Sequence, residues 1–309
     1  MRAVELTTFG GTDGLRLTDV PEPVPGPGQV LVDVRRAGVN YADLSRREGT
    51  YDRRFAPPLV LGAEVAGVRR DTGERVVALT GGFGGYAEVV AVDEALAFPV
   101  PDGLEDDVAL ALLLQGLTAF HVLCTSAELE YGDTIVIHAA AGGVGSLAVQ
   151  LATLWGAGRV IGVASTPAKR EAVLALGADA AVDAAAEGLA DRLLVANGGR
   201  PVDVILETVG GDVFAQSLRV LAPSGRIVVF GAAGGEPRAA GDARVVAFSL
   251  PELFADRARL AAPLGELFDA ALEGRIAPVL GGTYALADVA AAHADLAARR
   301  TTGKLLLTP

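Results

Sequence analysis

The amino-acid sequence predicts an α/β protein in which a doubly wound parallel sheet is combined with a discontinuous β-rich domain. Three features of the sequence lead to this class. The first part of the chain contains strand patterns, the middle part alternates short apolar strands with helices, and a last apolar strand follows two further helices. With 309 residues, the chain is long enough for two domains that each bury a core.

Residues 1 to about 120 are predicted to be β-rich. Apolar and polar residues alternate over 15–20 and 30–34, as they do in strands with one buried face. The connection between them, residues 21–28, is too rich in proline for a helix. Further short strands are predicted over 65–68, 75–79 and 87–92.

From about residue 120, strands and helices alternate, and the strands are short and uniformly apolar. This pattern is typical of a parallel sheet that is covered by helices on both faces and joined by right-handed crossovers. The strands are predicted at 134–138, 160–164, 180–182, 202–206 and 226–230, and the helices at 145–155, 167–176, 187–196 and 212–221.

The chain becomes helical again from about residue 259, with predicted helices over 260–273 and 286–299. The final strand, 304–307, is expected to return to the β-rich domain. The predicted domains are therefore residues 1–120 together with 259–309, and residues 121–258.

A glycine-rich turn joins the strand at 134–138 to the helix at 145–155. Its sequence, Ala139-Ala140-Ala141-Gly142-Gly143-Val144-Gly145, is a variant of G-x-G-x-x-G with alanine in the first place. Glycine permits a tight turn and lets backbone N–H groups approach a pyrophosphate at the start of the helix. Glycine-rich turns also join strands to helices without binding anything. The strand–turn–helix context favours a dinucleotide site.

The end of the next strand indicates which dinucleotide binds. An acidic residue at that place accepts hydrogen bonds from the ribose 2′-hydroxyl of NAD. Here the strand ends in Ala164-Ser165-Thr166-Pro167-Ala168-Lys169-Arg170, with hydroxyl and cationic side chains and no acid. These groups suit the 2′-phosphate of NADPH. Ser/Thr followed by proline is also an ordinary helix start, and both roles are compatible.

Composition excludes several other classes. A net charge of −12 disfavours a nucleic-acid partner, and no apolar run reaches the length of a membrane span. The single cysteine, Cys124, excludes an internal disulfide and is consistent with a reducing compartment. The N-terminus has no apolar signal segment. We therefore expect a cytoplasmic protein without a membrane or nucleic-acid partner.

Several ordered motifs resemble a known family. They are Ala37-Gly38-Val39-Asn40-Tyr41-Ala42-Asp43, Leu61-Gly62-Ala63-Glu64-Val65-Ala66-Gly67, Gly85-Tyr86-Ala87-Glu88, Gly116-Leu117-Thr118-Ala119, the glycine turn, Phe230-Gly231 and Arg299-Arg300-Thr301-Thr302-Gly303-Lys304. Together they extend over essentially the whole chain. The sequence resembles the zinc-independent quinone oxidoreductase (zeta-crystallin-like) branch of the medium-chain dehydrogenase/reductase superfamily.

This resemblance implies a GroES-like substrate domain around a Rossmann domain, with the active site in the cleft and NADPH as the cofactor. The implied cofactor-binding residues are Asn40, Thr118, Ala141, Gly142, Gly143, Val144, Ser165, Thr166, Lys169, Phe230, Gly231, Arg299 and Lys304. It also implies a homodimer, for which residues 244–248 are the candidate edge strand.

The sequence departs from the zinc-dependent relatives. Those relatives place a cysteine and a histidine at positions that correspond to about Asn40 and Ala63. The histidines of this chain, His121, His138 and His293, are scattered, and catalytic zinc needs about three converging ligands. We therefore expect no metal.

Without zinc, the acceptor must be easy to reduce. Conjugation in a quinone or an α,β-unsaturated carbonyl spreads the negative charge that hydride addition creates, so a hydrogen-bond donor and a late proton suffice. Tyr51 and Tyr41 are the candidate catalytic proton donors, while Asp43 is expected to be a structural hydrogen-bond acceptor. Two alternatives remain: a 2-enoyl-thioester (enoyl-CoA/ACP, polyketide-type) reductase and a non-catalytic NADPH-binding protein.

Overall fold

The computed structural model describes residues 1–51, 55–235 and 244–309. The chain divides into two compact units. The first, here called the β-rich unit, comprises residues 1–114, 253–274 and 278–309, and the second, the parallel-sheet unit, comprises residues 115–252 and 275–277. The sequence predicts divisions after residues 120 and 258.

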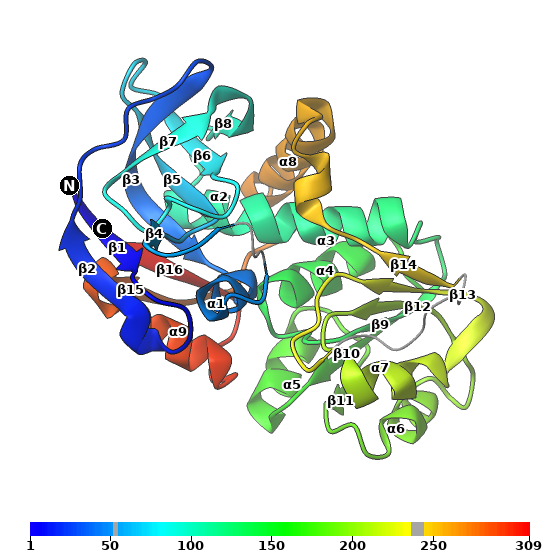
Figure 1. The fold of residues 1–309 in the computed structure, drawn as a ribbon. Coiled ribbons are helices and arrows are strands. Elements are labelled where there is room, and N and C mark those ends of the chain that lie inside the picture. Colours follow the sequence, from blue (N-terminus) through cyan, green and yellow to red (C-terminus); the bar gives the residue numbers. More distant parts are fainter. Residues whose placement is uncertain (52–54, 236–243) are drawn as a thin grey trace. The chain divides into compact units, whose positions relative to one another are not determined.

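The β-rich unit contains two sheets in its described part (Figure 1). The larger has the order β15-β16-β3-β5-β6-β8, with β7 paired to β3, and the smaller has the order β2-β1-β4. Their strands are β1 (Arg2–Leu6), β2 (Leu15–Asp19), β3 (Gln29–Val39), β4 (Leu59–Val60), β5 (Glu64–Arg69), β6 (Arg75–Leu79), β7 (Val89–Asp93), β8 (Ala97–Pro99), β15 (Leu280–Ala285) and β16 (Lys304–Thr308).

The last strand of the chain joins this unit, as the sequence predicts. β16 pairs antiparallel with β3, with Leu306 opposite Gly38 and Leu305 opposite Val39. The alternation of β3 buries Val30, Val32 and Val34 in one hydrophobic core together with Leu305 and Leu307 of β16. Residues near 38–40 and near 304 are thereby brought together, although more than 260 residues separate them in sequence.

Helices complete the β-rich unit. They are η1 (Thr12–Gly14), α1 (Tyr41–Glu48), η2 (Glu94–Leu96), α2 (Asp106–Ala111), α8 (Arg257–Leu272), η6 (Leu286–Asp288) and α9 (Val289–Ala297). The residue pattern does not predict α1. Its start is fixed by a capping box, in which the Asn40 side chain accepts from the backbone of Asp43 and the Asp43 carboxylate accepts from Asn40 N–H.

The parallel-sheet unit has one fully parallel sheet in the described residues, with the order β11-β10-β9-β12-β13-β14 (Figure 1). Its strands are β9 (Thr134–Ile137), β10 (Arg159–Ala164), β11 (Ala180–Asp183), β12 (Val202–Glu207), β13 (Leu221–Val229) and β14 (Val245–Ala247). The helices are α3 (Leu117–His121), α4 (Gly143–Leu154), α5 (Pro167–Ala175), α6 (Leu189–Ala196) and α7 (Gly211–Leu218), and η5 (Leu250–Leu253) follows β14.

The strand order defines a switch point in this sheet. From β9 the chain proceeds outward through β10 and β11, and then returns to place β12 on the other side of β9. In open α/β sheets, ligands bind at the carboxyl ends of the strands where the order reverses. The expected ligand edge of this unit is therefore the carboxyl edge around β9 and β12.

One helical stretch of the chain is both long and apolar. Residues Asp106–Ser126 form a helical run of 21 residues with two π-helical segments, η3 (Leu112–Gly116) and η4 (Val122–Ser126). It is long and apolar enough to cross a membrane by length and composition only, and 72% of its most apolar window is buried. A buried core helix passes the same test, so this is weak evidence for a membrane span.

Candidate functional site

The glycine turn between β9 and α4 is shaped by close backbone contacts. Ala139 adopts a positive φ of 49°, and its carbonyl accepts from Gly142 N–H at 2.8 Å. A Cβ on Gly145 would lie 2.3 Å from the Ala139 carbonyl oxygen, and one on Gly143 would lie 1.9 Å from Gln115 Oε1. Backbone packing therefore requires glycine at position 145, whereas a Cβ at position 143 would displace the end of the Gln115 side chain.

The turn also exposes the start of α4 to an anion. Gly142 is the N-cap residue and provides no side-chain cap, and the first turn of the helix contains no acidic residue. The first N–H groups of a helix have no partner within the helix, and its dipole favours negative charge at that end. The N-terminus of α4 is therefore suited to a phosphate group.

A second cluster stands at the carboxyl end of β10. Ser165 is exposed, and Thr166 is the N-cap of α5, where its hydroxyl accepts from Lys169 N–H at 3.3 Å. Pro167 occupies the first position of the helix. The capping role predicted for this segment is thus present. By their positions at the end of β10 and in the first turn of α5, Ser165 and Lys169 are candidate phosphate ligands.

The switch point is lined by the segments that follow β12 and β13. Glu207 is fully buried, and its Oε1 accepts from the N–H groups of Val209 at 2.5 Å and Gly210 at 3.1 Å. The Glu207 carbonyl accepts from Phe230 N–H at 3.0 Å, which ties the start of the segment after β13 to the end of β12. Phe230 and Gly231, both predicted cofactor residues, therefore lie at the carboxyl edge of the sheet.

In the β-rich unit, a buried ion pair forms around the predicted residue Asn40. Lys304 and Glu64 are both fully buried and in contact, and Lys304 Nζ also donates to Asn40 Oδ1 at 3.0 Å. Asn40 Nδ2 donates to Glu64 Oε1 at 2.8 Å. A Cβ on Gly38 would lie 2.6 Å from Glu64 Oε1 and 2.7 Å from Lys304 Nζ, so this glycine makes room for the pair.

A second buried group of polar side chains lies beside α1. Tyr86 donates its hydroxyl proton to Asp43 Oδ2 at 3.0 Å, and His293 Nε2 lies 3.2 Å from the same hydroxyl oxygen. Burial raises the pKa of Asp43 and raises that of Tyr86, and burial lowers the pKa of His293 to about 3. Asp43 also accepts from Asn40 N–H and Arg46, which agrees with its expected structural role.

The two predicted proton donors are accessible. Tyr41 is 40% exposed and begins α1, and Tyr51 is 47% exposed and follows the same helix. The guanidinium of Arg46 lies over the Tyr51 ring, 4.3 Å from its centroid. Both residues therefore lie at the surface of the β-rich unit.

The remaining predicted cofactor-binding residues differ in how far they are buried. Thr118 is buried in α3, and Ala141 is buried in the glycine turn next to the more accessible Val144. Arg299 is exposed and follows α9 with a positive φ of 55°, an uncommon conformation for a residue with a side chain.

The histidines do not converge on a common point. His121 Nδ1 lies 2.9 Å from Thr125 Oγ1, and His138 Nε2 lies 2.8 Å from Ser217 Oγ. Ser217 donates its proton to the Val213 carbonyl, so its oxygen accepts from His138. Over residues 1–51, 55–235 and 244–309, no group of three His, Cys, Asp or Glu side chains is arranged to hold a metal ion.

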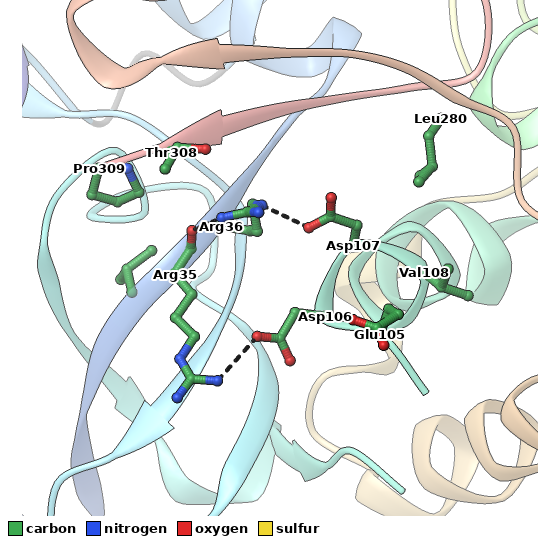
Figure 2. A pocket seen from close by; sticks show the side chains of 10 residues that line it. Arg35, Arg36, Glu105, Asp106, Asp107, Val108, Leu280, Thr308 and Pro309 are labelled. Carbon is green, nitrogen blue, oxygen red and sulfur yellow. Dashed lines mark hydrogen bonds and ion pairs between the residues drawn. The ribbon is translucent and has the colours of Figure 1, made fainter. Parts of the chain in front are cut away.

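A separate cavity of about 570 Å³ lies elsewhere in the β-rich unit (Figure 2). Charged pairs line it: Arg35 contacts Asp106 at 3.4 Å, and Arg36 contacts Asp107 at 2.6 Å. It contains none of the predicted site residues.

Comparison with known proteins identifies the family. Residues 26–102 match the alcohol dehydrogenase GroES-like domain, and residues 143–263 match the zinc-binding dehydrogenase domain. Over its whole length, the chain is 35% identical to a quinone oxidoreductase from Pseudomonas aeruginosa and covers 99% of that protein. The chain belongs to the quinone oxidoreductase family. The predicted resemblance and the predicted Rossmann and GroES-like folds are thus confirmed.

Two further similar proteins bear on the chemistry of this chain. The crystal structure of Escherichia coli quinone oxidoreductase complexed with NADPH superposes with a TM-score of 0.94, at 29% identity and full coverage of both chains. The chain is also 38% identical, over 97% of its length, to a segment that makes up 14% of the spectinabilin polyketide synthase system protein NorB from Streptomyces orinoci.

The sequence did not predict Glu64 or Tyr86 as site residues of this chain. Both lie within motifs that carry the resemblance, yet neither had a role assigned from sequence. A signal was present at Glu64, because a carboxylate within the apolar run Leu61–Gly67 must find a buried partner. The partner, Lys304, is distant in sequence and only strand pairing locates it.

Proposed function

We propose that this chain is an oxidoreductase that reduces quinones or other activated α,β-unsaturated carbonyls with NADPH and without zinc. The observation that carries the proposal is the glycine turn that leads into the uncapped start of α4, next to the hydroxyl and cationic side chains at the end of β10. The relative from Escherichia coli was solved with NADPH, which agrees with the predicted cofactor.

The residues present fit this cofactor. The turn is built from glycines at which a Cβ would collide, and it leaves helix N–H groups and no acidic side chain for a pyrophosphate. Ser165, Thr166 and Lys169 would hold a 2′-phosphate, and Phe230 and Gly231 would lie near the nicotinamide. When bound, NADPH supplies the hydride.

In the β-rich unit, we assign an orienting role to the buried ion pair. The Asn40 amide is fixed at both ends, since its oxygen accepts from Lys304 and its nitrogen donates to Glu64. Lys304 is fully buried, so it would act on the cofactor through Asn40. Arg299 is exposed and would contact the cofactor directly.

The proposed acceptor follows from the donor groups that the chain offers. The described histidines and carboxylates form no three-ligand cluster, so the polarising group would be a hydrogen-bond donor. Tyr41 and Tyr51 are partly exposed, and either would donate a proton after hydride addition. A conjugated acceptor needs less activation than a simple ketone, because conjugation spreads the negative charge that hydride addition creates.

The identity to a segment of a polyketide synthase protein favours a second candidate, a 2-enoyl-thioester reductase. NADPH oxidation with 1,4-benzoquinone and with crotonyl-CoA separates the two. The proposal predicts faster turnover of the quinone, and turnover of the thioester alone would establish the second candidate. Tight NADPH binding without turnover of either compound would indicate a non-catalytic NADPH-binding protein.

Assembly and location are further proposals. The strand β14, within the predicted edge segment 244–248, is the outermost strand of the parallel sheet in the described residues. Pairing of this strand with a second copy would form the expected homodimer. The cytoplasmic location and the absence of membrane and nucleic-acid partners remain predictions from composition.

A further inference from the structure

Two oppositely charged side chains meet at the carboxyl ends of β10 and β11. Arg170, in the first turns of α5, places Nη1 2.6 Å from Oδ2 of Asp183, the last residue of β11. The same nitrogen donates to the carbonyl of Ala164, the last residue of β10, at 3.2 Å. The Arg170 side chain is 23% exposed and the Asp183 side chain is 41% exposed, so both groups are accessible to solvent.

Strand register puts this pair at a defined place in the cofactor-binding unit. β10 and β11 are parallel, and Ala164 lies opposite Asp183. The glycine turn is adjacent, because Ala140 N–H donates to the Val163 carbonyl at 3.0 Å. In a dinucleotide-binding unit, the end of the second strand contacts the adenosine ribose. β9 and β10 are the first and second strands here, so the pair stands at the ribose subsite.

The two side chains have opposite effects on a ribose 2′-phosphate. A guanidinium binds phosphate through several N–H donors, whereas a carboxylate repels it and instead accepts from a free 2′-hydroxyl. Arg170 is engaged by Asp183 and by the Ala164 carbonyl. A phosphate would have to share the guanidinium with an anion already bound to it.

The Asp183 carboxylate is held in this position. Its Oδ1 accepts from Ala185 N–H at 2.9 Å, and its backbone carbonyl accepts from Arg192 Nη2 at 3.1 Å. The backbone hydrogen bond from Ala185 and the charge of Arg170 lower the pKa of Asp183, so the group is ionised at neutral pH.

We propose that Asp183 is a specificity-determining residue for the cofactor, which weakens the preference for a 2′-phosphorylated adenosine by engaging Arg170 and by placing a negative charge beside the phosphate. This inference deepens the proposed use of NADPH and rests on it. Without Asp183, the chain would bind NADPH with a larger advantage over NADH.

The test uses adenosine fragments, so that binding is measured without turnover. Dissociation constants of 2′,5′-ADP and 5′-AMP are determined by calorimetry for the full chain and for Asp183→Asn. Asparagine keeps an oxygen for Ala185 N–H but removes the charge. We expect 2′,5′-ADP to bind about fivefold more tightly to the variant, as for one exposed charge pair, with little change for 5′-AMP.

Asp191→Asn provides the matched control, because Asp191 is an exposed aspartate of α6 in the same unit. It should leave the ratio of the two constants unchanged. Asp183→Ser, which also preserves an oxygen for Ala185 N–H, replaces the asparagine variant if that protein does not fold. An unchanged or smaller 2′,5′-ADP advantage in the folded variant would overturn the inference.

The same measurement separates this inference from the proposed function. If the unmodified chain binds 2′,5′-ADP no better than 5′-AMP, the proposed NADPH preference fails. The effect of removing the Asp183 charge is the difference between the variant and the unmodified chain in the ratio of the 2′,5′-ADP and 5′-AMP dissociation constants. This difference can be measured whether or not the unmodified chain prefers 2′,5′-ADP.

Discussion

Lys304→Met tests the buried ion pair that fixes Asn40. Lys304 is fully buried, contacts Glu64 and donates to Asn40 Oδ1 at 3.0 Å. Methionine fills similar space with a flexible apolar chain and removes the charge. The Glu64 carboxylate then stays in a site without solvent contact and loses its cationic partner.

The size of the effect follows from what remains around Glu64. Removing one partner of a buried ion pair costs about 3–5 kcal/mol. Asn40 Nδ2 at 2.8 Å and Leu114 N–H at 3.0 Å still donate to the carboxylate, so we expect about 3 kcal/mol, at the lower end of that range. In the double variant Glu64→Gln/Lys304→Met, no uncompensated charge is left. Its loss should be about 1–2 kcal/mol smaller than that of Lys304→Met alone.

Urea unfolding followed by circular dichroism measures these free energies. The single tryptophan, Trp155, lies in the parallel-sheet unit, so its fluorescence reports on the unit that the substitution does not touch. We expect the circular dichroism transition of the β-rich unit to shift. Two results would show that the ion pair does not stabilise the β-rich unit in this way. One is a change in the free energy of unfolding of less than about 0.5 kcal/mol for Lys304→Met. The other is a double variant whose loss equals the sum of the losses caused by Glu64→Gln and Lys304→Met alone.

Three further predictions concern the turn, the phosphate site and pH. Lys169→Ala should weaken NADPH binding by about 1–3 kcal/mol with little change for NADH, measured by calorimetry, and equal weakening of both would count against a 2′-phosphate contact. Ala139→Gly should raise the thermal unfolding temperature by relieving the positive φ of 49°, worth about 1 kcal/mol, and a lowered temperature would refute strain at this residue. Burial lowers the pKa of His293 from 6.5 in the unfolded chain to about 3, so the folded state favours the neutral imidazole. The contribution of this neutral imidazole to the free energy of unfolding is therefore complete above pH 6.5. As the pH falls from 6.5 toward 3, His293 lowers the free energy of unfolding by about 1.4 kcal/mol per pH unit. Asp43, whose pKa is raised, makes a contribution of the opposite sign. His293→Gln should flatten this decline in urea unfolding measured between pH 6.5 and 4.5, and an unchanged slope would show that another group is responsible.

The sequence predicts the alternation of strands and helices, because each strand or helix has its own local pattern of apolar and polar residues. The short apolar strands β9, β10 and β12 lie where they were predicted, within one or two residues at their ends. The return of β16 to the first domain was also predicted, since an isolated apolar strand after two helices needs a sheet to pair with. These features depend on local periodicity and on burial, both of which the sequence displays.

The helix α1 was missed for a physical reason. Tyr41–Glu48 has a polar composition, and its start depends on reciprocal hydrogen bonds between Asn40 and Asp43 instead of an apolar stripe. The extent of β3 was likewise underestimated, because its last residues, Ala37–Val39, no longer alternate.

Partnerships between distant side chains could not be predicted. The family resemblance implies that Lys304 contacts the cofactor, and the structure pairs Lys304 with Glu64 inside the β-rich unit. The cation Arg170 was noted at the end of β10, while its engagement by Asp183 emerges only from the register of β10 and β11. Whether these residues act on a bound cofactor remains a prediction.

The most direct test of the central claim is NADPH oxidation with 1,4-benzoquinone by protein dialysed against a chelator, with zinc content measured on the same sample. The account predicts that the metal-depleted protein keeps its full rate and that added zinc does not increase it. Loss of turnover on depletion, followed by recovery with zinc, would contradict a reductase that works through hydrogen-bond donors alone.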